Sequence, residues 1–178
     1  MNIIVNADQN WGIGSKAKLL FPLSQDLKHF KALTTGKIVV MGRRTLQSLP
    51  DGKPLPNRIN VVLSRKKAFK IKDAVIFSSP EGLGRAVRNG FFKPYTGNDF
   101  FVIGGEQIYH LFLPFCNTAY VTRVEAVSSS ADTFFPNLDK NPDWQVIEVS
   151  DKMIEGDLMF RFVTYQRLKN TTKVKLFT

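Results

Sequence analysis

Residues 38–46 read IVVMGRRTL, and residues 101–109 read FVIGGEQIY. In each stretch, a short run of branched or aromatic apolar residues leads through glycine into a segment with helical character. Such runs are typical of strands buried on both faces. A strand that is followed directly by a helix is typical of a right-handed crossover connection in a mostly parallel sheet. The two stretches therefore predict an α/β fold.

Strands and helices alternate through the first two thirds of the chain. Further strand-like runs occupy residues 3–7, 59–64 and 74–79. Helical patterns occupy residues 24–35, 42–49, 80–90 and 106–115. We expect Ser24 to cap the first helix and Gly36 to end it. The last strand-like runs are residues 119–127, 144–151 and 158–168, with no helical pattern between them. These runs should pair at one side of the sheet, the last of them antiparallel.

Composition limits the class of protein. A chain of 178 residues with 43% hydrophobic content can bury a core, and most simply forms one domain. The single cysteine, Cys116, excludes an internal disulfide and a thiolate metal cluster, which fits a reducing compartment, and we expect it to be a small core residue. No basic leader or bilayer-length apolar run is present, so we expect a soluble, cytoplasmic protein. We also expect that it binds no metal.

The net charge of +10 is consistent with nucleic acid, acidic lipid or small anionic ligands as partners. Most lysines are best interpreted as a solvated surface, whereas Arg43, Arg44 and Arg65 follow glycine or the end of a strand. The first amides of a helix and an adjacent glycine favour a bound phosphate, so we predict a dinucleotide phosphate site beside these arginines. No GxGxxG motif is present, and the glycines could equally serve tight turns.

Asp26 lies among Leu23, Leu27 and Phe30 in the first predicted helix. An acid in the first turn offsets the helix dipole, and this structural interpretation is sufficient on spacing alone. No second acid lies close enough in sequence to form an acid–base pair. We interpret the histidines, His29 and His110, as helix-surface residues. The residues alone therefore leave the role of Asp26 open.

Six segments in a fixed order make the sequence similar to the dihydrofolate reductase family. They are NWGIG, DLKHFKALTTGKIVVMGRRTLQSL, PLPNRINVVLSR, VIGGEQIY, YVTRVEA and ADTFFP. The resemblance implies one domain over residues 1–169, with an eight-stranded, mainly parallel sheet, an antiparallel C-terminal strand and four flanking helices. Residues 170–178 would be a frayed or adventitious tail. It also implies reduction of 7,8-dihydrofolate to tetrahydrofolate by hydride transfer from NADPH, with protonation of pterin N5.

The resemblance also implies roles for individual residues. Asp26 matches the acid that binds the pterin ring, and Thr122 the threonine that orients it. Substrate-binding positions are Val5, Asn6, Leu27, Phe30, Lys31, Leu49, Leu55, Arg58, Ile103 and Tyr109, with Arg58 on the glutamate tail. Cofactor-binding positions are Ala7, Ile13, Gly14, Gly42, Arg43, Arg44, Thr45, Leu63, Ser64, Arg65, Gly104, Gly105, Glu106, Gln107, Ile108 and Thr133. Gly104 and Gly105 match a pair joined by a cis peptide.

Two positions depart from the family pattern. Leu20-Phe21 replaces the common Pro-Trp, which removes an indole donor and the stiffness of proline from the loop. Asn6 replaces the usual alanine and brings an amide close to the pterin or nicotinamide. Expected partners are dihydrofolate and antifolate inhibitors, bound to a monomer. The alternatives are a related NADPH-dependent reductase of a pyrimidine or riboflavin precursor, and a basic nucleic-acid-binding module.

Overall fold

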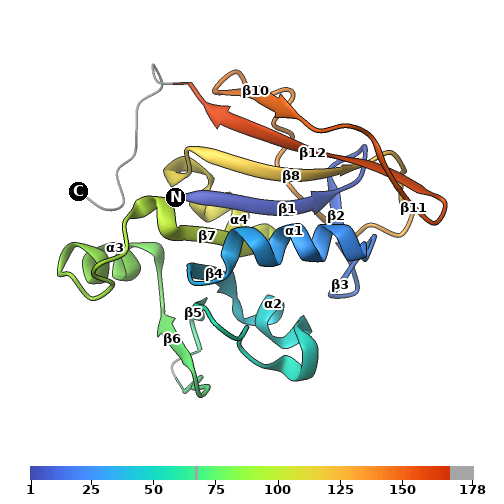
Figure 1. The fold of residues 1–178 in the computed structure, drawn as a ribbon. Helices are drawn as coiled ribbons and strands as arrows, with labels where there is room; N and C mark the ends of the chain where they lie inside the picture. The colour runs from blue at the N-terminus through green and yellow to red at the C-terminus, as the bar shows by residue number, and fades with distance from the viewer. Residues whose placement is uncertain (67, 169–178) are drawn as a thin grey trace.

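The structure is a computed structural model, which describes residues 1–66 and 68–168 (Figure 1). The expected tail, residues 170–178, lies outside the described residues, as does the expected domain boundary at residue 169. The main sheet consists of β1 (Asn2–Ala7), β4 (Ile38–Gly42), β5 (Ile59–Leu63), β6 (Ala74–Phe77), β7 (Phe100–Gly104), β8 (Thr118–Val124), β10 (Trp144–Val149), β11 (Met153–Glu155) and β12 (Leu158–Arg167). Eight of these strands follow the order β10-β12-β8-β1-β7-β4-β5-β6, and β11 pairs with β12 off this path.

The sheet confirms the expected α/β fold. Neighbouring strands from β8 to β6 along this order are parallel, while β12 runs antiparallel to β8 and β10 antiparallel to β12. The three late strands lie together on one side, as predicted. The short β11 was not predicted, and it adds a ninth strand beside β12.

Helices cover both faces of the sheet. They are α1 (Ser24–Thr34), α2 (Arg43–Ser48), α3 (Pro80–Arg88) and α4 (Glu106–Phe112), with short 3-10 turns at Pro50–Gly52, Gly97–Asp99 and Leu113–Phe115. Apolar residues of α3 and α4 join one large core cluster, and Leu46 of α2 joins a second. In Figure 1, α1 crosses in front of the sheet and α4 lies behind it. Within the described residues, no helix has both the length and the apolar character needed to cross a membrane.

The start of α1 differs from the prediction. Ser24 is the first helical residue, and its side chain does not cap the helix. Instead, the Glu155 carboxylate accepts hydrogen bonds from the backbone amides of Ser24, at 2.6 Å, and Gln25, at 3.1 Å. Free amides at a helix start attract an anion, and here the anion comes from β11. Gly36 has a φ of 75°, which confirms that it ends the helix.

A second, smaller sheet was not predicted. It contains β2 (Gly12–Ser15), β3 (Lys18–Leu19) and β9 (Thr133–Phe134), in the order β3-β2-β9. Asp132 ties this sheet to the turn between β2 and β3, because its carboxylate accepts a 2.7 Å hydrogen bond from the Lys16 amide. The fully buried Asp8 accepts from the amides of Gly12 and Ser128. The β2–β3 hairpin is therefore held by residues more than a hundred positions further along the chain.

Candidate active site

The two glycine junctions predicted from the sequence lie side by side. Strand β4 pairs with β7, so the helices that follow them, α2 and α4, begin at the same edge of the sheet. A methyl group on Gly42 would lie 3.0 Å from Cγ1 of Ile108, and one on Gly105 would lie 3.3 Å from Oγ1 of Thr45. The Gly104–Gly105 peptide bond is cis, as expected. The glycines therefore allow the starts of α2 and α4 to pack closely. The free backbone amides at these two helix starts are suited to bind a phosphate chain.

The arginines predicted to bind phosphate follow adjacent strands. Gly42 at the end of β4 is in register with Leu63 at the end of β5, so Arg43 and the Ser64-Arg65 pair leave the sheet at neighbouring points. The Arg43 guanidinium packs over the Phe69 ring at 5.9 Å. Arg65 is exposed. An arginine from each of two strand ends can therefore approach one anion.

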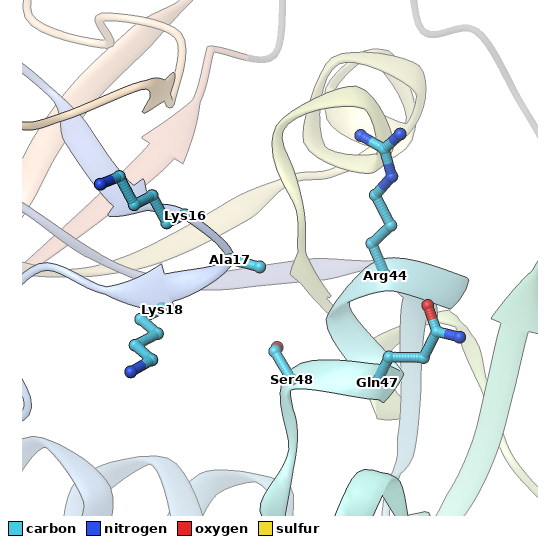
Figure 2. Close-up of a pocket in the computed structure, with 6 residues that line it drawn as sticks. All are labelled: Lys16, Ala17, Lys18, Arg44, Gln47 and Ser48. Atoms are coloured by element: carbon cyan, nitrogen blue, oxygen red, sulfur yellow. The ribbon is translucent and has the colours of Figure 1, made fainter.

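A pocket of about 390 Å³ opens between the β2–β3 hairpin and α2 (Figure 2). Its lining residues are Lys16, Ala17, Lys18, Arg44, Gln47 and Ser48. In Figure 2 the hairpin residues stand on one side and the α2 residues on the other. The lining carries three cations and no acid, which favours an anionic ligand. Of these residues, only Arg44 was predicted as a site residue.

Asp26 lies in the first turn of α1 and is buried, with 7% of its surface exposed. The hydroxyl of Thr122, on β8, donates to Oδ1 at 2.5 Å. The side-chain amide of Asn6, on β1, donates to Oδ2 at 3.1 Å. A buried carboxylate needs such donors, because burial without partners is costly. The structure thus brings together Asp26, Thr122 and Asn6, three residues singled out from the sequence.

His29 differs from its expected place on the helix surface. It is half-buried, and its ring stacks on Phe162 of β12 with centroids 4.0 Å apart. Burial lowers the pKa of His29, and the charge of Asp26 partly offsets that effect. His110 is exposed, as expected. Among the described residues, no group of three or more His, Cys, Asp and Glu side chains is placed to hold a metal ion.

The apolar residues predicted to bind the substrate differ in exposure. Val5 is buried in the sheet, whereas Leu27 is 52% exposed although it follows Asp26 directly. The half-buried members of the predicted wall are Phe30, Leu49, Leu55 and Ile103. Lys31 is exposed. Partly exposed apolar side chains such as these are suited to bind a flat, largely apolar group.

Arg58 is fixed beside this wall. Its Nε donates to Oγ1 of Thr34 at 2.9 Å, its Nη1 donates to the Pro56 carbonyl at 2.7 Å, and its guanidinium lies 5.6 Å from the Phe30 ring centroid. Burial lowers its pKa below the ordinary value for arginine. Within residues 1–66 and 68–168, Arg58 has no acidic partner, so its charge can bind a ligand carboxylate.

Asn60 organises the loop that carries Leu55 and Arg58, and sequence reasoning missed it. Its side chain is 2% exposed, accepts from the Leu55 amide at 2.9 Å, and donates to the Leu55 and Arg58 carbonyls at 2.9 and 3.2 Å. A polar residue inside the apolar run INVVL was the available signal. Such a residue is buried only when its hydrogen bonds are satisfied.

Tyr109 joins α4 to the central strand. Its hydroxyl donates to the Ile4 carbonyl at 2.9 Å, and burial raises its pKa above the ordinary value. Its ring fits against Gly104, where a methyl group would lie 3.2 Å away. Gly104 has a φ of 118°, which favours glycine. Tyr109 thus supports the junction predicted to bind the cofactor.

The remaining predicted cofactor residues lie around this junction. Ala7 ends β1, while Ile13 and Gly14 lie in β2, where Gly14 pairs with Thr133 of β9. The Glu106 carboxylate accepts a 3.2 Å hydrogen bond from the Phe134 amide, so it anchors β9. Gln107, beside Glu106, is exposed.

A buried acid, two glycine junctions at one edge of the sheet and a pocket lined by cations define an α/β protein that is suited to an anionic ligand such as a dinucleotide. Comparison with known proteins specifies the family. The sequence model of the dihydrofolate reductase family matches residues 1–167. The chain therefore belongs to the dihydrofolate reductase family.

Individual relatives agree with this assignment. The chain is 32% identical to the dihydrofolate reductase of Staphylococcus haemolyticus over 171 residues, which cover 95% of this chain and 96% of that protein. It is 42% identical to the Mycobacterium leprae enzyme over 158 residues, 87% of this chain and 90% of that one. A solved structure of Enterococcus faecalis dihydrofolate reductase, complexed with NADP(H) and RAB-propyl, is 27% identical. It has a TM-score of 0.78, and the match covers 93% of this chain and 95% of that one.

Proposed function

We propose that the protein reduces 7,8-dihydrofolate to tetrahydrofolate with NADPH, using Asp26 as the acid that binds the pterin ring. The observation that supports this role is the setting of Asp26, a buried carboxylate with neutral donors on both oxygens. Each carboxylate oxygen has a second lone pair. Asp26 can therefore accept two further hydrogen bonds, from the exocyclic amine and the neighbouring nitrogen of the pterin.

Asp26 acts on the charge of the pterin. An ionised carboxylate favours a protonated or enol-shifted ring, which makes N5 easier to protonate. The carbon beside a protonated C=N bond is a better hydride acceptor. When bound, NADPH supplies the hydride from its nicotinamide. The protein contributes placement, since Leu27 and Phe30 on α1 and Ile103 on β7 hold the ring in an apolar cleft.

The dinucleotide would lie across the two glycine junctions. The residues fit this ligand because Gly42 and Gly105 let the starts of α2 and α4 pack closely, which brings the free amides of both helices to one edge of the sheet. Arg43, Ser64 and Arg65 would bind the 2′-phosphate, and Arg44 the charge of the diphosphate. Ala7, Ile13 and Gly14 would contact the nicotinamide.

Arg58 would bind the α-carboxylate of the folate glutamate tail. Thr34 and Pro56 already fix its guanidinium, so little side-chain entropy is lost on binding. Leu49, Leu55 and Phe30 would pack against the aminobenzoyl group. The same cleft would admit antifolate inhibitors, and we expect a monomer that acts in the cytoplasm without specific nucleic-acid binding.

The alternative substrate, a pyrimidine or riboflavin precursor, is not favoured, because the family match and the relatives are dihydrofolate reductases. The decisive experiment follows the loss of NADPH absorbance when dihydrofolate is added to purified protein. We expect turnover that requires both compounds. Consumption of NADPH with a pyrimidine substrate, and none with dihydrofolate, would contradict the proposal.

A further inference from the structure

Asn60 is a buried polar residue at a position that favours an apolar one. Side chains alternate along β5, so Asn60 lies on the same face of the strand as Val62. Val62 belongs to an apolar core cluster, and Leu55 packs against that cluster. Asn60 is 2% exposed, so its amide is shielded from water and needs partners in the protein. Those partners indicate what the amide does.

The side chain of Asn60 bonds to the backbone of one loop. Its Oδ1 atom accepts from the Leu55 amide at 2.9 Å. Its Nδ2 atom donates to the Leu55 carbonyl at 2.9 Å and to the Arg58 carbonyl at 3.2 Å. Leu55 and Arg58 begin and end the segment 55–58. One buried side chain therefore holds both ends of this loop.

The turn inside the loop is held as well. Asn57 has a φ of 57°, a left-handed conformation that asparagine tolerates better than most residues. Its carbonyl accepts a 2.8 Å hydrogen bond from the amide of Gly36, which follows α1. The loop is thus fixed at its ends by Asn60 and at its turn by the chain that leaves α1.

The same loop carries the Arg58 guanidinium. The Nη1 atom of Arg58 donates to the Pro56 carbonyl at 2.7 Å, and Pro56 lies between the two residues that Asn60 holds. The Nε atom donates to Oγ1 of Thr34 at 2.9 Å, and Thr34 is fully buried in α1. One side of the guanidinium is therefore fixed by the helix, and the other side by a carbonyl whose position depends on Asn60.

We infer that Asn60 is a positioning residue for the substrate tail, which fixes the loop 55–58 and so holds the Arg58 guanidinium where the α-carboxylate of dihydrofolate binds. This inference rests on the proposed function of Arg58. A planar guanidinium forms paired hydrogen bonds with a carboxylate only in a narrow range of orientations. A side chain that is ordered beforehand loses less entropy on binding. Asn60 thus raises substrate affinity without touching the substrate.

The central test is a double-mutant cycle on the whole protein, with dihydrofolate binding measured by fluorescence titration. Asn60→Ala should weaken dihydrofolate binding roughly three- to tenfold, which is less than the loss expected for Arg58→Ala. When Asn60→Ala is made in the Arg58→Ala protein, it should change the affinity by less than about twofold, because the group that Asn60 positions is gone. Additive losses from the two substitutions would overturn the inference.

Kinetic constants and a second ligand distinguish positioning from a general loss of structure. Asn60→Ala should raise KM for dihydrofolate and leave kcat nearly unchanged, because the glutamate tail lies far from the reacting carbon. A pterin without the glutamate tail should bind to the variant as it binds to wild type. A fall in kcat, or equal losses for the two ligands, would contradict a role that acts through Arg58.

Two further variants control for a cavity and for the loss of a buried amide. Asn60→Leu keeps the side-chain volume and removes the hydrogen bonds, so it should weaken dihydrofolate binding as Asn60→Ala does. Asn2→Ala removes another buried asparagine, at the start of β1, whose side chain donates to the Asn98 carbonyl at 2.8 Å. It should leave dihydrofolate affinity unchanged. A matching loss in the Asn2 variant would show that loosening of the sheet explains the effect.

The order of the Arg58 side chain can be measured in wild-type protein, so this part of the test does not depend on the folding of a variant. In ligand-free protein labelled with ¹⁵N-arginine, the Arg58 Nε–H bond should have an NMR order parameter near that of rigid backbone, about 0.85. Asn60→Ala should lower this value. A wild-type value below about 0.6 would overturn the inference, because the guanidinium would not be held before the ligand binds.

The inference and the proposed function fail in different ways. If Arg58→Ala weakens dihydrofolate binding but neither Asn60 variant does, only the role of Asn60 is overturned. If Arg58→Ala leaves the affinity unchanged, the proposed role of Arg58 is wrong and the inference is overturned with it.

Discussion

The hydroxyl of Thr122 donates a 2.5 Å hydrogen bond to Oδ1 of Asp26, across a separation of 96 residues. Thr122 belongs to β8, and its register opposite Asn6 of β1 places both donors next to each other in the sheet. The rigid sheet therefore fixes the carboxylate, although Asp26 itself is carried by a helix. A small change in this side chain should alter its chemistry without moving the helix.

Asp26→Asn should depress hydride transfer roughly a hundredfold or more at neutral and higher pH, where solvent protonation of N5 is scarce. Dihydrofolate binding should weaken less, because the apolar contacts remain. Single-turnover measurement of NADPH oxidation across pH checks this, with equilibrium titration of the ligand as the control. Near-normal single-turnover rates at neutral pH would show that Asp26 is not the essential acid.

Arg58→Ala should weaken dihydrofolate binding roughly tenfold to a hundredfold, because a charge-assisted, bidentate contact is lost. A pterin without the glutamate tail should bind almost as before. Arg58→Lys keeps the positive charge but loses the paired N–H donors of the guanidinium, so it should bind dihydrofolate more tightly than Arg58→Ala and less tightly than wild type. Fluorescence titration of both ligands makes the comparison. Equal losses for the two ligands would assign Arg58 a structural role.

Arg43→Ala and Arg65→Ala should each weaken NADPH roughly tenfold to a hundredfold while sparing NADH. The two cofactors differ by the 2′-phosphate, and these arginines follow the paired ends of β4 and β5. The preference of wild-type protein for NADPH should also shrink as salt rises. Calorimetric titration of both cofactors provides the measurement. Proportional loss of both cofactors would place the 2′-phosphate elsewhere.

Glu155→Gln should lower the thermal midpoint at neutral pH by roughly 2–4 °C, because the amides of Ser24 and Gln25 lose their anionic partner. These amides hold the pKa of Glu155 below its ordinary value of 4.5. Its contribution is thus complete above about 4.5 and is lost as pH falls through the lower folded value. Asp157→Asn, at the exposed turn of the same hairpin, is the control. A pH-independent difference between wild type and Glu155→Gln would refute the electrostatic explanation.

Local sequence predicted the features that depend on local chemistry. The apolar, branched run before Gly42 indicated a strand, and the pattern of GRRTLQSL indicated the helix that follows it. The cap of α1 was mispredicted because the group that accepts from its first amides, the Glu155 carboxylate, lies far from Ser24 in the sequence. Short strands such as β9 carry too few residues to show a period.

The site was harder to predict from residues alone. Asp26 was noticed among apolar residues, but spacing gave it a sufficient structural explanation, and only the resemblance assigned it a role in binding the pterin ring. Lys16 and Lys18 are indistinguishable in sequence from solvated lysines, and a pocket emerges only when their hairpin folds opposite α2. The position of Asn60 inside an apolar run marked it as unusual, but its hydrogen-bond partners in the Leu55 backbone could not be predicted from the sequence.

The central position of β1 has a consequence for synthesis. Both neighbours of this first strand come from the second half of the chain, since Asn2 is in register with Phe101 of β7 and Thr118 of β8. On the ribosome, β1 therefore emerges long before β7 and β8. Its backbone N–H and C=O groups cannot form their sheet hydrogen bonds until those strands have been synthesised. Contacts this distant in sequence slow folding and leave the nascent chain open to chaperones until β8 has emerged.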